Sequence, residues 1–148
     1  QECETELERL MAQSLGAMPG LYELLDELKA AEFPLAVATS SERKYAEYVL
    51  DRLEIKPRFR FVLTAEDIRH GKPNPEIYLL AASQLQLAPE QMMVLEDSAH
   101  GCQAAVDAGT FAVAVPHEFT RNLPYQGARL VADSLADPRI RQALGLAV

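Results

Sequence analysis

The chain has 148 residues, of which 49% are hydrophobic, and a formal net charge of −8. This length and composition predict one globular domain with a buried core. The acidic excess argues against a protein that binds nucleic acid, because such binding rests on clustered Lys and Arg. No stretch approaches the ~18 continuous apolar residues of a membrane span, and Cys3 and Cys102 indicate neither a disulfide framework nor a zinc site. We therefore expect a cytoplasmic protein that binds neither nucleic acid nor a membrane.

The periodicity of the apolar residues predicts helices that alternate with short strands. In chain order, we expect helices over residues 2–15, 20–33, 42–53, 75–85, 98–108 and 134–144, the last interrupted or started by Pro138. Strands are expected over residues 35–38, 59–63, 92–96, 111–115 and 129–132. Such alternation is typical of a parallel sheet with helices on both faces. The sequence therefore predicts an α/β, Rossmann-like fold.

Polar residues directly follow three of the predicted strands, and one such group is Thr64 to Asp67, after the strand over residues 59–63. In parallel α/β folds, ligands bind at the carboxyl ends of the strands, where such residues gather. Thr39, Ser40 and Ser41 follow the first strand, and they either line a site or cap the next helix. Glu96 and Asp97 end the strand over residues 92–96. They either share a cation such as Mg²⁺, or Asp97 or the following serine caps the next helix.

A lysine occupies a loop that two prolines stiffen. In the stretch HGKPNPEIY, Pro73 keeps Lys72 out of helical geometry, and we expect Asn74 as the N-cap of the next helix with Pro75 at its first position. Lys72 is therefore either a point charge for a phosphate or a solvated surface lysine. The sequence of the loop leaves both interpretations open.

Taken together, these segments resemble the haloacid dehalogenase (HAD) superfamily of phosphoryl-transfer enzymes, in the branch that contains β-phosphoglucomutases and small sugar-phosphate phosphatases. The stretches PGLYELLDELKAAEFPLAVATSS, GKPNPEIYLLAA and VLEDSAHGCQAAVDAG look like the second, third and fourth motifs of that family. The resemblance implies that residues 1–16 are the C-terminal remnant of a cap region and that residues 17–148 are the HAD-like core domain.

The resemblance also implies a role for each candidate site residue. Thr39, with Ser40 beside it, would bind the oxygens of the phosphoryl group, and Lys72 would neutralise charge on that group and on the nucleophile. Asp97, with Glu96, would hold Mg²⁺. These roles favour a Mg²⁺-dependent phosphatase that hydrolyses a small phosphorylated metabolite. A β-phosphoglucomutase-like phosphomutase and a non-catalytic binding or complementation fragment are the alternatives.

The chain departs from the family in lacking the nucleophile. The family uses two aspartates separated by one residue on its first strand, and none of the seven aspartates of this chain has that spacing. The first strand, which is central in the family's sheet, is absent as well, which would leave two inner strands with unpaired edges. We hypothesise that the natural protein is longer, which a start at Gln1 also suggests, or that a second chain supplies the strand. Alone, the 148 residues are expected to be inactive.

Overall fold

The computed structural model describes residues 18–117 and 120–146. The helix expected over residues 2–15 and the proposed cap remnant lie outside the described residues. The described helices are α2 (Leu21–Ala30), α3 (Arg43–Arg52), α4 (Glu76–Leu85), α5 (Ala99–Asp107) and α6 (Pro138–Leu144). The strands are β1 (Val37–Ala38), β2 (Val62–Leu63), β3 (Met93–Glu96), β4 (Phe111–Ala114) and β5 (Leu130–Val131). Three 3₁₀ turns, at Lys56–Arg58, Ala65–Asp67 and Pro89–Gln91, complete the described elements.

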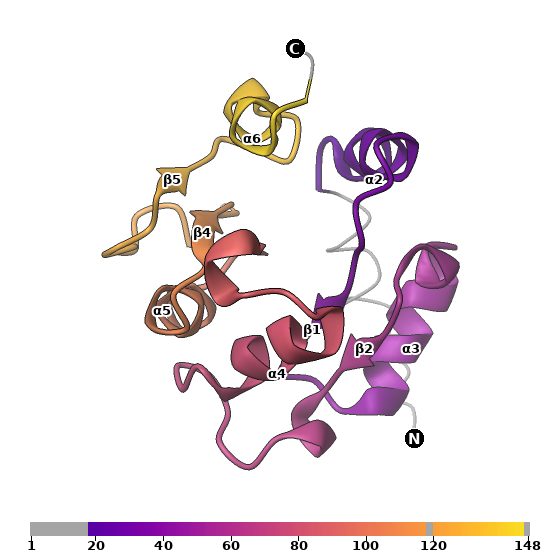
Figure 1. The fold of residues 1–148 in the computed structure, drawn as a ribbon, viewed down its shortest axis with the longest axis vertical. Coiled ribbons are helices and arrows are strands. Elements are labelled where there is room, and N and C mark those ends of the chain that lie inside the picture. Colours follow the sequence, from indigo (N-terminus) through magenta and orange to yellow (C-terminus); the bar gives the residue numbers. More distant parts are fainter. Residues whose placement is uncertain (1–17, 118–119, 147–148) are drawn as a thin grey trace.

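The strands form two parallel sheets in the described part of the chain. β1 pairs with β2 (Figure 1). β4 pairs with both β3 and β5. Helix α3 connects β1 to β2, and α5 connects β3 to β4, so both connections are βαβ crossovers. The predicted alternation of strands and helices and the parallel pairing are confirmed.

Successive residues of the strands pack on opposite faces, as the period of two in a strand requires. On one face, Ala38 and Val94 belong to a core shared with α4 and α5. On the other face, Val37 packs with residues of α2 and α3, and Val113 packs with residues of α2 and α6. Helices therefore cover both faces, which confirms the predicted fold class.

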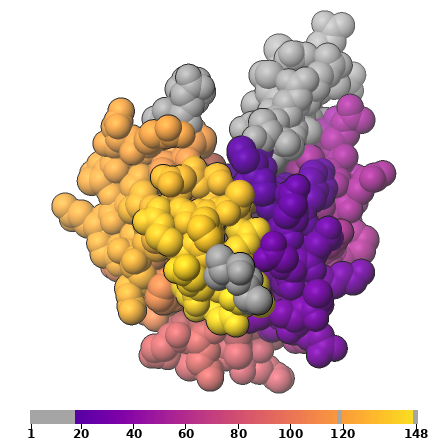
Figure 2. All heavy atoms as spheres, turned by 90° about the horizontal axis from the view of Figure 1, so that it is seen from above, coloured from indigo at the N-terminus to yellow at the C-terminus, as the bar shows by residue number. Residues whose placement is uncertain are grey.

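Helices α2 and α6 come from distant parts of the sequence and lie side by side (Figure 2). The guanidinium of Arg141 in α6 donates to the carboxylate of Glu27 in α2 at 3.0 Å. The N-cap Asp137 accepts the N–H of Arg139, and Pro138 opens α6. Proline is favoured there because its missing N–H has no partner within the helix.

Four strands, β1, β2, β3 and β5, have an open edge in the described structure. β1 pairs there with β2 alone and β3 with β4 alone, although the core that contains Ala38 and Val94 joins both sheets. The residues of β1 are only half-buried, and Leu95 of β3 is 36% exposed, whereas Val113 of β4 is fully buried. The residues of β1 and Leu95 of β3 are thus less buried than Val113 of the inner strand β4.

No described helix combines the length and the apolar character needed to cross a bilayer.

Candidate active site

The carboxyl end of β1 carries three hydroxyl side chains. The amide of Thr39 donates to the carbonyl of Leu63 at 3.0 Å, which holds Thr39 at the end of the β1–β2 ladder. Its Oγ1 accepts the N–H of Ser41 at 3.1 Å, so the hydroxyl hydrogen remains for donation to another acceptor. Ser40 is exposed. The N-cap of α3 is Glu42, and the three hydroxyl residues therefore do not occupy the capping position.

The loop before α4 is fixed by the first turn of that helix. The carboxylate of Glu76 accepts the backbone N–H groups of Arg69 at 2.6 Å and His70 at 2.9 Å. The hydrogen bond from His70 is the main reason that the pKa of Glu76 is lowered. Oδ1 of Asn74 accepts the N–H of Glu76 at 3.0 Å. The residues on both sides of the site lysine are thus hydrogen-bonded to the same helix start.

Lys72 lies between the two sheets. Its Nζ donates to the carbonyl of Ala38 at the end of β1, at 3.2 Å, and to the carboxylate of Glu96 at the end of β3. The side chain of Lys72 is 9% exposed. Lys72 is therefore a buried cation at the carboxyl ends of two strands, and the interpretation as a solvated surface lysine is wrong.

Glu96 is a buried carboxylate with two donors on one oxygen. Oε1 accepts hydrogen bonds from Nζ of Lys72 and from the hydroxyl of Tyr78. The other side of the carboxylate lies against Gly101 of α5, where a Cβ atom would overlap it. Burial, and then the charge of Glu96, raises the pKa of Tyr78 far above its ordinary value. Tyr78 therefore stays protonated and can act as a donor.

Asp97 and Ser98 occupy different surroundings from Glu96. The side chain of Asp97 is 48% exposed and its Oδ2 lies 4.0 Å from Nε2 of His117, whereas that of Glu96 is 8% exposed. Ser98 is the N-cap of α5, and its Oγ accepts the N–H of Gly101 at 3.0 Å. Because Ser98 caps the helix, Asp97 is not needed for that purpose.

The described residues could supply part of a magnesium site. Mg²⁺ typically takes one or two carboxylates, with waters and substrate phosphates as its other ligands. Asp97 fits this requirement because half of its side chain is accessible. Glu96 is engaged by Lys72 and Tyr78. No group of three or more His, Cys, Asp or Glu side chains that could hold a metal occurs among residues 18–117 and 120–146.

The structure brings together some of the predicted site residues and not others. Hydrogen bonds join Lys72 to Glu96 and to the residue before Thr39, but in the described structure none joins Lys72 to Ser40 or Asp97. The contacts of Tyr78 and Gly101 with Glu96 were not predicted from the sequence. Both residues lie in helices whose apolar and small residues indicate core packing.

Arg43, at the start of α3, has a structural partner. Its Nη2 donates to Oδ2 of Asp67 at 2.7 Å and to the carbonyl of Val62 at 3.0 Å. The same carboxylate accepts the N–H of Thr64 at 2.8 Å. This last bond is the main cause that lowers the pKa of Asp67, and the charge of Arg43 adds to it. Arg43 thus fixes the β2 loop.

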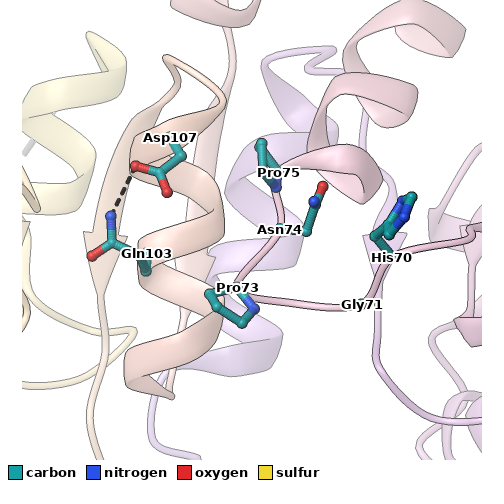
Figure 3. A pocket seen from close by; sticks show the side chains of 7 residues that line it. All are labelled: His70, Gly71, Pro73, Asn74, Pro75, Gln103 and Asp107. Carbon is teal, nitrogen blue, oxygen red and sulfur yellow. Dashed lines mark hydrogen bonds between the residues drawn. The ribbon is translucent and has the colours of Figure 1, made fainter.

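A shallow hollow lies beside the Lys72 loop, between that loop and α5 (Figure 3). His70, Asn74, Gln103 and Asp107 are among its lining residues, and Gln103 donates to Asp107 at 2.8 Å. None of Thr39, Lys72, Glu96 and Asp97 lines it. The hollow therefore does not include the candidate site residues at the strand ends.

Residues 2–115 match the model of the haloacid dehalogenase-like hydrolase family. The match covers more than half of the chain, and the chain belongs to this family. The predicted membership of the superfamily is thereby confirmed.

Similar proteins include a phosphorylated carbohydrates phosphatase of Thermotoga maritima, 38% identical over 104 residues, which are 70% of this chain and 48% of the relative. The crystal structure of CbbY from Rhodobacter sphaeroides in complex with phosphate has a TM-score of 0.77 and 32% identity, over 82% of this chain and 55% of that one. A putative β-phosphoglucomutase from Thermotoga maritima has a TM-score of 0.70 and 37% identity, over 76% and 54%. The chain thus spans about half the length of the relatives that it matches.

Proposed function

We propose that this chain is the core of a Mg²⁺-dependent phosphatase that hydrolyses a small phosphorylated metabolite, through an aspartyl-phosphate whose aspartate lies outside the 148 residues. The observation that carries the proposal is the buried Lys72 between the carboxyl ends of β1 and β3, paired with Glu96. A buried cation at strand ends is suited to bind the oxygens of a transferring phosphoryl group.

Lys72, Thr39 and Ser40 would each stabilise negative charge on the phosphoryl group. Lys72 would place its positive charge against the phosphoryl oxygens and the attacking carboxylate, in surroundings where little water screens it. Thr39 would donate its hydroxyl hydrogen to a phosphoryl oxygen, since its Oγ1 is already oriented by the N–H of Ser41. Ser40, exposed beside it, would contact the same group. Phosphoryl transfer gains its rate mainly from such positioning and charge stabilisation.

Asp97 would hold the metal ion, with Glu96 beside it, and the ion would neutralise negative charge on the substrate phosphate. Glu96 has a second task, because it keeps the ammonium of Lys72 in place. This division explains how two adjacent carboxylates are tolerated at the end of an apolar strand. Lys72 offsets the buried one, and solvent or a cation offsets the exposed one.

The nucleophile would be supplied by an additional strand between β1 and β3. Both strands have an unpaired edge within the described residues, and β1 and Leu95 are incompletely buried. A strand in this position would end next to Lys72, which contacts both of its neighbours. The strand would come from a longer natural chain or from a second chain, and the described part alone would be inactive.

The similarity to a phosphorylated carbohydrates phosphatase supports sugar phosphates as the substrate class. The similarity to a putative β-phosphoglucomutase supports a phosphomutase as the second candidate. The two functions differ in the acceptor of the phosphoryl group, which is water in one case and a sugar hydroxyl in the other.

A kinetic assay of the natural protein tests the proposal. Release of orthophosphate from a panel of sugar phosphates should require Mg²⁺, cease on addition of EDTA and return when Mg²⁺ is restored. Asp97→Asn should abolish this turnover while the protein stays folded. Full activity of Asp97→Asn would rule out the metal role of Asp97, and isomerised sugar phosphate without release of orthophosphate would favour the mutase.

A further inference from the structure

Tyr78 has one feature that core packing does not require. Its ring belongs to the core between the sheets and α4, and the residue is 4% exposed. A phenylalanine would fill the same space. The hydroxyl distinguishes the two residues, and it donates to Oε1 of Glu96. A buried tyrosine hydroxyl usually finds a partner, but here the partner is the carboxylate that also holds Lys72.

The position of Glu96 is set from two sides. Tyr78 reaches its carboxylate from α4 through the hydroxyl. On the side of α5, Gly101 leaves room for the carboxylate, because a Cβ atom there would overlap both carboxylate oxygens. The carboxylate is therefore clamped between two helices, and neither contact belongs to a residue that touches the proposed site of the phosphoryl group.

The ammonium of Lys72 depends on this clamp. Its contacts are the carbonyl of Ala38, the carboxylate of Glu96 and the ring of Tyr78, whose centroid lies 5.1 Å from Nζ. The ring provides a cation–π contact, and the hydroxyl of the same residue orients the carboxylate. Tyr78 thus acts on Lys72 by two routes, one of which the Tyr78→Phe substitution removes selectively.

We propose that Tyr78 is a positioning residue for phosphoryl transfer, whose hydroxyl holds Glu96 and, through Glu96, the ammonium of Lys72. The inference rests on the function proposed above. Tyr78 would then affect the transition state although it packs as a core residue. Gly101 would have a complementary role, because it leaves room for the Glu96 carboxylate between α4 and α5.

The first experiment compares Tyr78→Phe with Tyr22→Phe in the natural protein. Tyr22, which is 42% exposed, is the control, since its hydroxyl donates to the carbonyl of Leu53 at 3.1 Å, between α2 and α3. Tyr78→Phe should lower kcat by about 10-fold, the size of effect expected for a hydrogen bond to a charged group, with KM changed by less than about 2-fold. Tyr22→Phe should leave both constants within about 2-fold of the unsubstituted protein.

A second readout is independent of turnover. Orthovanadate imitates the geometry of the phosphoryl group in transfer, so its affinity, measured by calorimetry, should fall in Tyr78→Phe by the same factor as kcat. In a Lys72→Met background, Tyr78→Phe should lower the remaining kcat by less than about 2-fold, because the two residues act through one contact. Gly101→Ala displaces the same carboxylate from the α5 side and should reproduce the loss even if Tyr78→Phe fails to fold.

The outcomes separate this inference from the function on which it rests. If Lys72→Met leaves kcat unchanged, the proposed function fails and the inference fails with it. If Lys72→Met lowers kcat but Tyr78→Phe behaves like Tyr22→Phe, the positioning role is overturned and the function stands. The positioning role would also be overturned if Tyr78→Phe lowered kcat by the same factor with and without Lys72, or if Gly101→Ala left kcat unchanged.

Discussion

Replacing Lys72 by methionine should destabilise the protein far more than the loss of an ordinary surface lysine. The side chains of Lys72 and Glu96 are 9% and 8% exposed, so Lys72→Met leaves a buried carboxylate without its cation. Removing one partner of a buried ion pair costs about 3 to 5 kcal/mol. That is a large part of the ~5 to 15 kcal/mol by which native domains are stable.

Urea denaturation of the natural protein, followed by far-UV circular dichroism, measures this cost. The control is Lys56→Met, since Lys56 lies 3.7 Å from Glu47 with both side chains about 40% exposed, and such pairs contribute about 0 to 1 kcal/mol. The double variant Lys72→Met/Glu96→Gln removes both charges and should recover at least about half of the loss. A cost for Lys72→Met no greater than that for Lys56→Met would refute the assignment of a buried pair.

Two further predictions concern stability. Gly20→Ala should destabilise the protein by at least about 1 kcal/mol in urea denaturation, because φ of Gly20 is +88° and a Cβ there would lie 2.5 Å from the amide nitrogen of Ala136. Gly71→Ala is the control and should cost less, because a Cβ at Gly71 would meet open space. Equal losses of stability in the two variants would contradict this reasoning. Arg139 lowers the pKa of buried Asp137, so the stabilisation it brings is present above the unfolded pKa of about 4 and is lost as the pH falls toward the folded pKa. The stability advantage of the unsubstituted protein over Asp137→Asn should therefore be largest near neutral pH and shrink below about pH 5, and an advantage that is independent of pH down to about 3 would argue against it.

The elements with a strong local pattern were predicted closely. β3 and β4 occupy Met93–Glu96 and Phe111–Ala114, within the predicted ranges, because each is a short apolar run with turn residues around it. β1 is shorter than predicted, at Val37–Ala38, although the carbonyl of Leu35 still accepts the N–H of Arg60 at 2.8 Å. A strand's observed length depends on its partners, and β1 has a partner on one edge in the described structure.

The helix before the site was predicted with an error of one residue. Asn74 was expected as the N-cap, but Pro75 holds that position and α4 begins at Glu76. The side chain of Asn74 still accepts the N–H of Glu76, so Asn74 provides a hydrogen bond to the helix start although it lies one position before the N-cap. Helix ends often differ by a residue in this way.

The sequence predicted which residues form the candidate site, but it did not predict most of the contacts between them. The two prolines beside Lys72 indicated a fixed loop, but burial of the ammonium depends on the carbonyl of Ala38 and on Glu96, which are far from it in sequence. The sequence also suggested that Glu96 and Asp97 converge on one cation. In the structure, Glu96 shares the face of Val94 and lies against α4 and α5, because side chains alternate along β3. That Glu96 and Asp97 share a cation stays a prediction.

Intact-mass measurement of the natural protein under denaturing conditions, made on the same sample that is assayed for phosphatase activity, tests the central claim most directly. The account predicts that an active sample contains a chain heavier than the 16.4 kDa of these residues, or a second chain, and that the additional sequence supplies the paired aspartates. An active sample whose sole component has a mass of 16.4 kDa would contradict the account, because the nucleophile would then lie among these 148 residues.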